Sequence, residues 1–193
     1  MVQSTGPKKI NCAVFISGTG SNLKSLIQFS KKKNSLVLIK LIISDNNKAK
    51  GLKYGKKFKI SNKVFNYKNK KITEKKIISE MKNNKIKLIC LAGFMKILSK
   101  DFIKIFDGKI LNIHPSLLPK YKGLNTHQRA ISNKEKFSGC TVHFVNSKLD
   151  SGKIILQKKV MISKSDTAKS LAKKILNQEH KLYPKAIRKV FSL

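Results

Sequence analysis

The sequence predicts an α/β domain with a mainly parallel, twisted sheet, helices on both faces and an antiparallel strand pair near the carboxyl terminus. Short apolar runs alternate with longer segments of helical period, which is typical of strand–helix–strand units. The last two apolar runs are separated only by residues 146–152, a short segment rich in turn formers. With 193 residues the chain can build one core, so we expect a single domain over residues 10–193 and a disordered tail over residues 1–9.

Seven apolar runs are expected to form the strands. They lie at Ile10–Ser17, Leu36–Ser44, Lys63–Phe65, Leu88–Ala92, Lys109–Ile113, Gly139–Val145 and Lys153–Met161. Apolar residues recur at helical spacing after the first run and again after the third, which favours helices covering a buried parallel sheet. A last helix is expected from Ala168 onward, with Asp166 or Thr167 as its cap, and Pro184 should kink or interrupt it.

The net charge of +34 raises the hypothesis of a nucleic-acid-binding protein. However, only two of the 43 basic residues are arginines, Arg129 and Arg188, and arginine is the residue favoured for bidentate contacts to phosphates and bases. The lysines are also spread along the chain and do not gather in one stripe. We therefore interpret the charge as a composition bias laid over an enzyme, and we keep a basic nucleic-acid-binding protein as the alternative of a different class.

The cysteines and the hydropathy indicate a soluble, cytoplasmic protein. Cys12 and Cys90 lie in apolar runs, Cys140 stands alone, and no CxxC spacing occurs, so small buried side chains are expected and no metal site is predicted. No apolar stretch reaches 18 residues, and the first nine residues have no apolar signal core.

The first candidate site is the loop Ser17–Asn22, which follows the first apolar run and opens a helix. Its glycines permit a tight turn, and the free N–H groups at a helix start can bind an anion such as phosphate. The loop has neither the third glycine of a dinucleotide fingerprint nor the Gly-Lys-Ser/Thr of a nucleoside-triphosphate loop. It is therefore either a phosphate site or an ordinary strand-to-helix turn.

The second candidate site begins at Asn112 and His114, at the end of the Lys109–Ile113 run. These two residues flank Ile113, so on an extended chain their side chains project to the same face. Ligands of open α/β sheets bind at such strand ends, and an amide donor beside an imidazole suits a carbonyl that becomes an oxyanion. A hydrogen-bonded core histidine is the alternative interpretation.

The third candidate is Asp150, in the segment between the last two strands. A carboxylate near His114 would stabilise the imidazolium and raise the pKa of the ring, as acid–base chemistry requires. A plain turn-forming aspartate is the alternative, and sequence spacing does not place Asp150 near His114.

Five stretches together resemble the folate-dependent formyltransferase family. They are ISGTGSNL (16–23), LAGFMKILS (91–99), NIHPSLLPKYKGLNTH (112–127), TVHFVNSKLDSG (141–152) together with IILQ (154–157), and QEH (178–180). The resemblance spans nearly the whole chain, and it implies a Rossmann-like formyltransferase fold.

The resemblance also implies roles for particular residues. Asn112, His114 and Asp150 match the family's catalytic trio. Gly20, Ser21 and Asn22 match a loop that holds the substrate phosphate, and Glu179 matches a ribose contact. Lys70 falls near a position that is often arginine in the family and that contacts folate. The other residues that match folate contacts are Met95, Lys96, Ile97, Leu98, Asn112, Asn146, Ser147, Lys148, Leu149 and Asp150.

The implied reaction is formyl transfer from 10-formyltetrahydrofolate to the amine of glycinamide ribonucleotide, a step of purine biosynthesis. The implied partners are these small molecules alone, without metal, nucleic acid or membrane, in a monomer or homodimer. Sister activities remain alternatives: formyl transfer to a nucleotide sugar or a tRNA-linked amino acid, and hydrolysis of formyltetrahydrofolate. The Gly20-Ser21-Asn22 loop and Gln178-Glu179-His180 favour the ribonucleotide.

Overall fold

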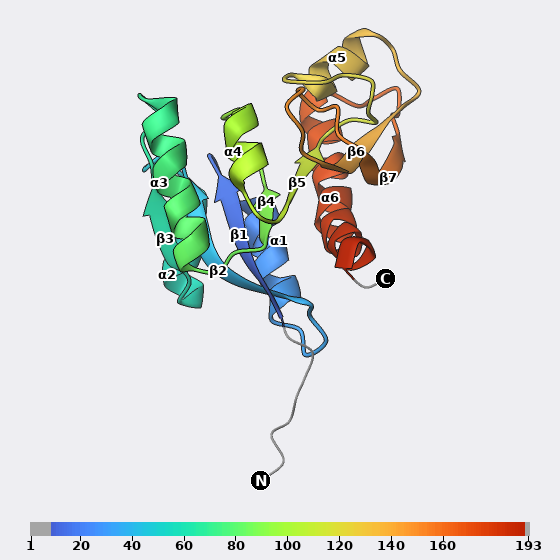
Figure 1. Cartoon of the computed structure of the whole chain (residues 1–193). Coiled ribbons are helices and arrows are strands. Elements are labelled where there is room, and N and C mark those ends of the chain that lie inside the picture. The colour runs from blue at the N-terminus through green and yellow to red at the C-terminus, as the bar shows by residue number, and fades with distance from the viewer. Residues whose placement is uncertain (1–8, 192–193) are drawn as a thin grey trace.

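A seven-stranded sheet runs through the molecule in the order β3-β2-β1-β4-β5-β6-β7 (Figure 1). This computed structural model describes residues 9–191. The strands are β1 (Ile10–Ile16), β2 (Val37–Ser44), β3 (Ser61–Val64), β4 (Leu88–Leu91), β5 (Lys109–His114), β6 (Phe137–Phe144) and β7 (Ile154–Met161). The pairings among β1 to β5 are parallel, whereas β5–β6 and β6–β7 are antiparallel, which confirms the predicted fold class.

Helices cover both faces of this sheet, as the alternating pattern predicts. They are α1 (Ser21–Ser30), η1 (Lys50–Leu52), α2 (Lys53–Phe58), α3 (Lys70–Asn83), α4 (Lys100–Ile105), α5 (Thr126–Ser132) and α6 (Ala168–Phe191). Successive residues of β1 divide between two buried clusters, because side chains alternate across a strand. Cys12, Val14 and Ile16 pack with α1 and α6, while Ala13 and Phe15 pack with α3 and α4.

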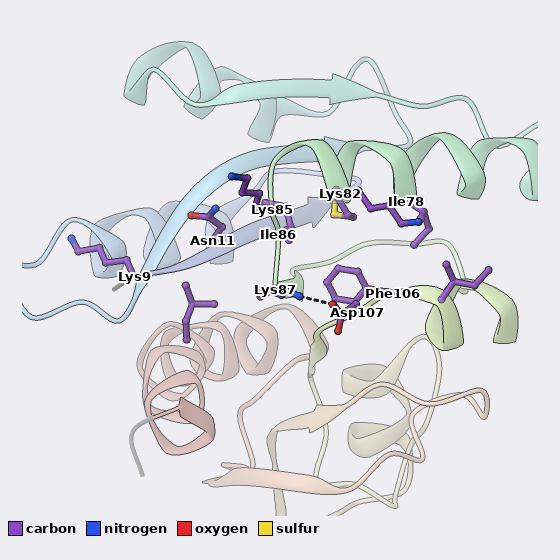
Figure 2. A pocket seen from close by; sticks show the side chains of 12 residues that line it. Lys9, Asn11, Ile78, Lys82, Lys85, Ile86, Lys87, Phe106 and Asp107 are labelled. Atoms are coloured by element: carbon purple, nitrogen blue, oxygen red, sulfur yellow. Dashed lines mark hydrogen bonds and ion pairs between the residues drawn. The ribbon is translucent and has the colours of Figure 1, made fainter. Parts of the chain in front are cut away.

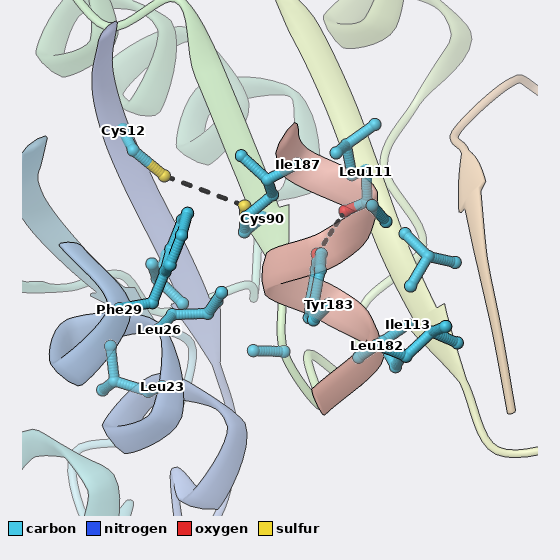
Figure 3. Close-up of a cluster of buried hydrophobic side chains, with 14 of the residues drawn as sticks. Cys12, Leu23, Leu26, Phe29, Cys90, Leu111, Ile113, Leu182, Tyr183 and Ile187 are labelled. Atoms are coloured by element: carbon cyan, nitrogen blue, oxygen red, sulfur yellow. Dashed lines mark hydrogen bonds between the residues drawn. The ribbon is translucent and has the colours of Figure 1, made fainter. Parts of the chain in front are cut away.

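Tyr183 joins α6 to the centre of the sheet. Its ring is fully buried, and its hydroxyl lies 3.1 Å from the carbonyl oxygen of Leu91 and 3.0 Å from that of Leu111 (Figure 3). The thiols of Cys12 and Cys90 are buried in the same cluster, which confirms their prediction as small core side chains. Tyr183 thus fixes the helix against the end of β4 and the middle of β5.

Of the two effects expected of Pro184, the interruption of the last helix is wrong, because α6 continues through it to Phe191, and the kink stays a prediction. A proline at this position cannot donate to the carbonyl four residues earlier, which belongs to His180. Ser25 of α1 donates its hydroxyl to that carbonyl at 2.9 Å and replaces the missing partner. At the other end, Thr167 accepts from the Ser170 N–H at 3.2 Å, so the predicted cap is confirmed at that residue.

The described residues 9–191 leave two sequence-based predictions untested. Positions 1–8 of the expected tail lie outside the described part of the chain, and the single-domain assignment stays a prediction. Within residues 9–191, no helix is both long enough and apolar enough to span a membrane.

Candidate active site

Asn112 and His114 lie at the carboxyl end of β5, where the sheet changes from parallel to antiparallel pairing. Their alternation along the strand sends both side chains to one face. His114 is only 5% exposed and Asn112 is half-buried, so a ligand at this strand end would meet both groups in a partly dry environment. The two side chains therefore lie together at the strand end, as the sequence predicts.

Asp150 reaches this strand end from the segment between β6 and β7. One carboxylate oxygen lies 3.3 Å from Nδ1 of His114, and the other accepts from Nδ2 of Asn112 at 3.3 Å. The backbone N–H of Gly123 donates to the carboxylate at 2.9 Å. Asp150 has φ of +44°, a sparsely populated conformation for a residue with a side chain, and backbone strain of this kind clusters at functional sites. The structure thus brings Asn112, His114 and Asp150 together.

Burial lowers the pKa of His114 below its ordinary value. The Tyr121 carbonyl, 2.8 Å from Nε2, and the Asp150 carboxylate both raise this pKa, but burial outweighs them. Asp150 therefore raises the pKa of His114, as expected of a nearby carboxylate, but the net shift in the ligand-free protein is downward. Because both ring nitrogens face acceptors, the surroundings are nevertheless ready to stabilise a charged ring.

Asp150 remains ionised in this site. Burial alone would raise the pKa of Asp150, but contact with His143, the Gly123 N–H and the nearby His114 lower it, and the net direction is down. A carboxylate thus faces Nδ1 of His114 over the whole neutral pH range.

His143 is a residue of the site that the sequence interpretation missed. Its Nδ1 lies 2.8 Å from the Phe144 carbonyl oxygen, and its Nε2 lies 3.6 Å from Oδ1 of Asp150. Nε2 lies 3.2 Å from Nδ2 of Asn112, and His143 stands opposite Asn112 in the β5–β6 register. The signal was the second histidine in the TVHF stretch, but the strand register that brings it to Asn112 is not readable from sequence.

The loop after β1 and the last helix meet at a second cluster. Gly20 has φ of +73° and precedes α1, whose first turn offers backbone N–H groups without intrahelical partners. Nδ2 of Asn22 donates to the Glu179 carboxylate at 2.7 Å, although the two residues are 157 positions apart in the sequence. The Oδ1 atom of Asn22 is buried and has no partner among the described residues. The predicted phosphate loop and ribose contact therefore form one polar site beside Ser21.

The residues that resemble a folate pocket include exposed apolar side chains near the trio. Met95 and Ile97, in the loop after β4, are each 60% exposed, and Leu149 beside Asp150 is 50% exposed. Lys96 is exposed, whereas Leu98 is buried under the loop. Exposed apolar groups next to polar ones suit a flat aromatic ligand with a polar edge. Asn146, Ser147 and Lys148, which lie between β6 and Leu149, are also exposed.

Lys70 lies far along the sheet from the trio. It is exposed in the first turn of α3, and α3 follows the edge strand β3. Three strands, β2, β1 and β4, separate β3 from β5 in the sheet. A folate contact of Lys70 stays a prediction.

A pocket of about 620 Å³ lies at the amino ends of the central strands, opposite the candidate site, and is not this site (Figure 2). Its lining includes Lys9 and Asn11 at the start of β1, and Lys87 and Asp107, which precede β4 and β5. The candidate catalytic and binding residues lie instead at the carboxyl ends of the strands, where open α/β sheets bind their ligands.

Comparisons with known proteins agree with this geometry. A family model described as formyl transferase matches residues 10–187. The phosphoribosylglycinamide formyltransferase of Haemophilus influenzae is 43% identical over 184 residues, which cover 94% of this chain and 86% of that protein. A crystal structure of the phosphoribosylglycinamide formyltransferase from Brucella melitensis superposes with a TM-score of 0.91 at 40% identity, covering 96% of this chain and 97% of that one.

Some longer relatives match this chain over only a part of their length. The trifunctional purine biosynthetic protein adenosine-3 of Bos taurus is 42% identical over 192 residues, which cover 98% of this chain. The chain spans only 19% of the length of that relative. With a family model that covers most of its residues and relatives matched over nearly their whole length, the chain belongs to the formyl transferase family.

Proposed function

We propose that this protein is a phosphoribosylglycinamide formyltransferase, which transfers the formyl group of 10-formyltetrahydrofolate to the amine of glycinamide ribonucleotide. The observation that carries the proposal is the meeting of the Asn112–His114–Asp150 cluster with two candidate binding loops at adjacent strand ends. The relatives that match over nearly their whole length bear this name. The proposed location is the cytoplasm, and the proposed partners are the two small substrates.

The substrates would occupy the two sides of the trio. The loop after β1 and the Asn22–Glu179 pair would hold the phosphate and ribose of the ribonucleotide. The exposed side chains of Met95, Ile97 and Leu149 would cover the aromatic part of the folate. The amine and the formyl carbon would then meet beside Asn112 and His114, and this proximity lowers the entropic part of the barrier.

The trio would stabilise the tetrahedral intermediate that forms when the amine attacks the formyl carbon. The bond from Nδ2 of Asn112 to Asp150 is long, at 3.3 Å, so this N–H can turn to the formyl oxygen as charge develops there. A developing oxyanion beside His114 adds a second negative partner and favours the charged ring that burial disfavours in the free protein. The site would therefore stabilise the transition state more than the bound substrates.

A proton must also move from the attacking amine to the departing folate nitrogen. The Asp150 carboxylate is fixed by the Gly123 N–H and held ionised, so it can orient a water molecule that carries this proton. No covalent enzyme intermediate is needed, because the amine attacks the formyl carbon directly.

The test is to identify the formyl acceptor. We would incubate the protein with 10-formyltetrahydrofolate and each of three amines (glycinamide ribonucleotide, an amino nucleotide sugar and a methionyl-tRNA) and analyse the products by mass spectrometry. Formylation of the ribonucleotide alone is expected, because the polar site at Asn22 and Glu179 suits a small ribose phosphate. Formylation of another amine, with the ribonucleotide unchanged, would contradict the proposed substrate.

A further inference from the structure

A buried carboxylate that takes no part in the proposed chemistry lies at the end of β2. The side chain of Asp45 is 8% exposed, although the residue follows a strand directly and is bordered by exposed asparagines. Its Oδ1 accepts from the Ser17 hydroxyl at 2.5 Å, and its Oδ2 lies 3.8 Å from Nζ of Lys96. Burial of a charge is costly unless the charge is hydrogen-bonded or paired, and Asp45 has both kinds of partner.

Ser17 transmits this contact to the loop after β4. Its hydroxyl oxygen accepts the backbone N–H of Met95 at 2.8 Å, while its own N–H donates to the Gly93 carbonyl at 3.0 Å. The hydroxyl has a single hydrogen, and the Asp45 carboxylate accepts it. Asp45 therefore fixes the orientation in which the lone pairs of Ser17 face Met95.

The contact joins the two loops to which the proposed function assigns the two substrates. Ser17 begins the Ser17–Asn22 loop, which leads to the proposed phosphate site. Met95 begins the Met95–Leu98 segment, which we call the folate wall because the proposed function places the folate against it. Asp45 also faces the Lys96 ammonium group, which belongs to the same wall. A carboxylate on a third loop thus orients the Ser17 side chain, which joins the two binding loops through Met95.

We propose that Asp45 is a positioning residue of this site: acting through Ser17, it fixes the position of the Met95–Leu98 folate wall relative to the phosphate loop. The proposal rests on the proposed function, because it concerns the relative placement of the two substrates. It assigns Asp45 an effect on substrate affinity and none on the chemistry, since no reacting group touches it.

The experiment measures kcat and KM for both substrates in single and double variants. Asp45→Ala and Ser17→Ala are each expected to raise KM for the formyl folate about tenfold, the effect of losing a hydrogen bond to a charged group, with kcat within about twofold of the original. Asp45→Asn keeps an oxygen that can accept from Ser17, so it is expected to restore most of the affinity. The double variant is expected to raise KM no more than Asp45→Ala alone does, because both changes remove the same connection from Asp45 through Ser17 to Met95.

The control is Asp107→Ala. Asp107 makes an equally short contact with Lys87 before the amino ends of β4 and β5 (Figure 2). The loss of a carboxylate there should leave both KM values unchanged. Unchanged KM values in Asp45→Ala, additive losses in the double variant, or an Asp45→Asn variant as impaired as Asp45→Ala would overturn the proposal. None of these results bears on the proposed function, which fails if the original protein does not formylate glycinamide ribonucleotide.

Discussion

At the scale of single residues, the site depends on the opposing effects of burial and charge on His114. Burial lowers the pKa of this ring, and Asp150 is one of the two groups that raise it. Asp150→Asn removes the charge and should therefore lower the pKa of His114 further. An NMR titration of the ring protons measures this pKa directly, and Asp101→Asn, at an exposed position, is the matched control. A pKa of His114 that rises or stays constant in Asp150→Asn would contradict the assigned contact.

The residues of the trio differ in how far sequence could predict them. Asn112 and His114 follow from the two-residue period of a strand, which is a local rule. The approach of Asp150 depends on a left-handed backbone at that residue and on the Gly123 N–H, and neither is encoded by spacing. His143 was missed because its place beside Asn112 depends on the register of two antiparallel strands.

At the scale of elements, close packing of two glycines holds the phosphate loop against η1. A Cβ on Gly51 would lie 2.6 Å from Cδ1 of Ile16 and 2.9 Å from Cα of Gly20, so Gly51→Ala must displace the loop. We expect a higher KM for the ribonucleotide and a lower melting temperature. Gly18→Ala is the control, since a Cβ there meets no atom within 4 Å. Equal KM values in the two variants would show that this packing does not shape the site.

The anchoring of α6 can be tested at Tyr183. Tyr183→Phe removes the hydroxyl that contacts the carbonyls of Leu91 and Leu111, and it should lower the free energy of unfolding by about 1–2 kcal/mol. Denaturant unfolding measures this loss. Tyr54→Phe is the comparison, because the Tyr54 hydroxyl makes no hydrogen bond within residues 9–191, and it should change little. Equal stabilities for the two variants would contradict the anchoring role.

Most elements were predictable because their apolar periods are local signals, and the exceptions have physical causes. β3 is exposed along its whole length as an edge strand, so its apolar signal is weak, and its position is Ser61–Val64 instead of Lys63–Phe65. At Pro184 of α6, the His180 carbonyl accepts from the Ser25 hydroxyl instead, a tertiary contact that no local rule contains.

At the scale of the whole molecule, three histidines make stability depend on pH. Burial lowers the pKa of His114, His127 and His180 in the folded protein, with further lowering of the latter two by His114 and Lys24 respectively. As pH falls through about 6.5, the unfolded chain binds more protons than the folded one, so stability is lost. Burial raises the pKa of Glu179, so the titration of this carboxyl acts in the opposite sense.

Urea unfolding at about pH 7.5 and pH 6.0 measures the balance between the three histidines and Glu179, because carboxyl groups with ordinary pKa values titrate well below that window. The midpoint is expected to be lower at pH 6.0. A midpoint that is equal or higher at pH 6.0 would contradict the assigned burial of these rings.

The most direct test of the central claim is a spectrophotometric assay of folate product formation from 10-formyltetrahydrofolate, with and without glycinamide ribonucleotide. The account predicts product only when the ribonucleotide is present, and a loss of turnover in His114→Ala without loss of folding. Equal product formation without the ribonucleotide would indicate a hydrolase, and unchanged turnover in His114→Ala would contradict the role of the trio.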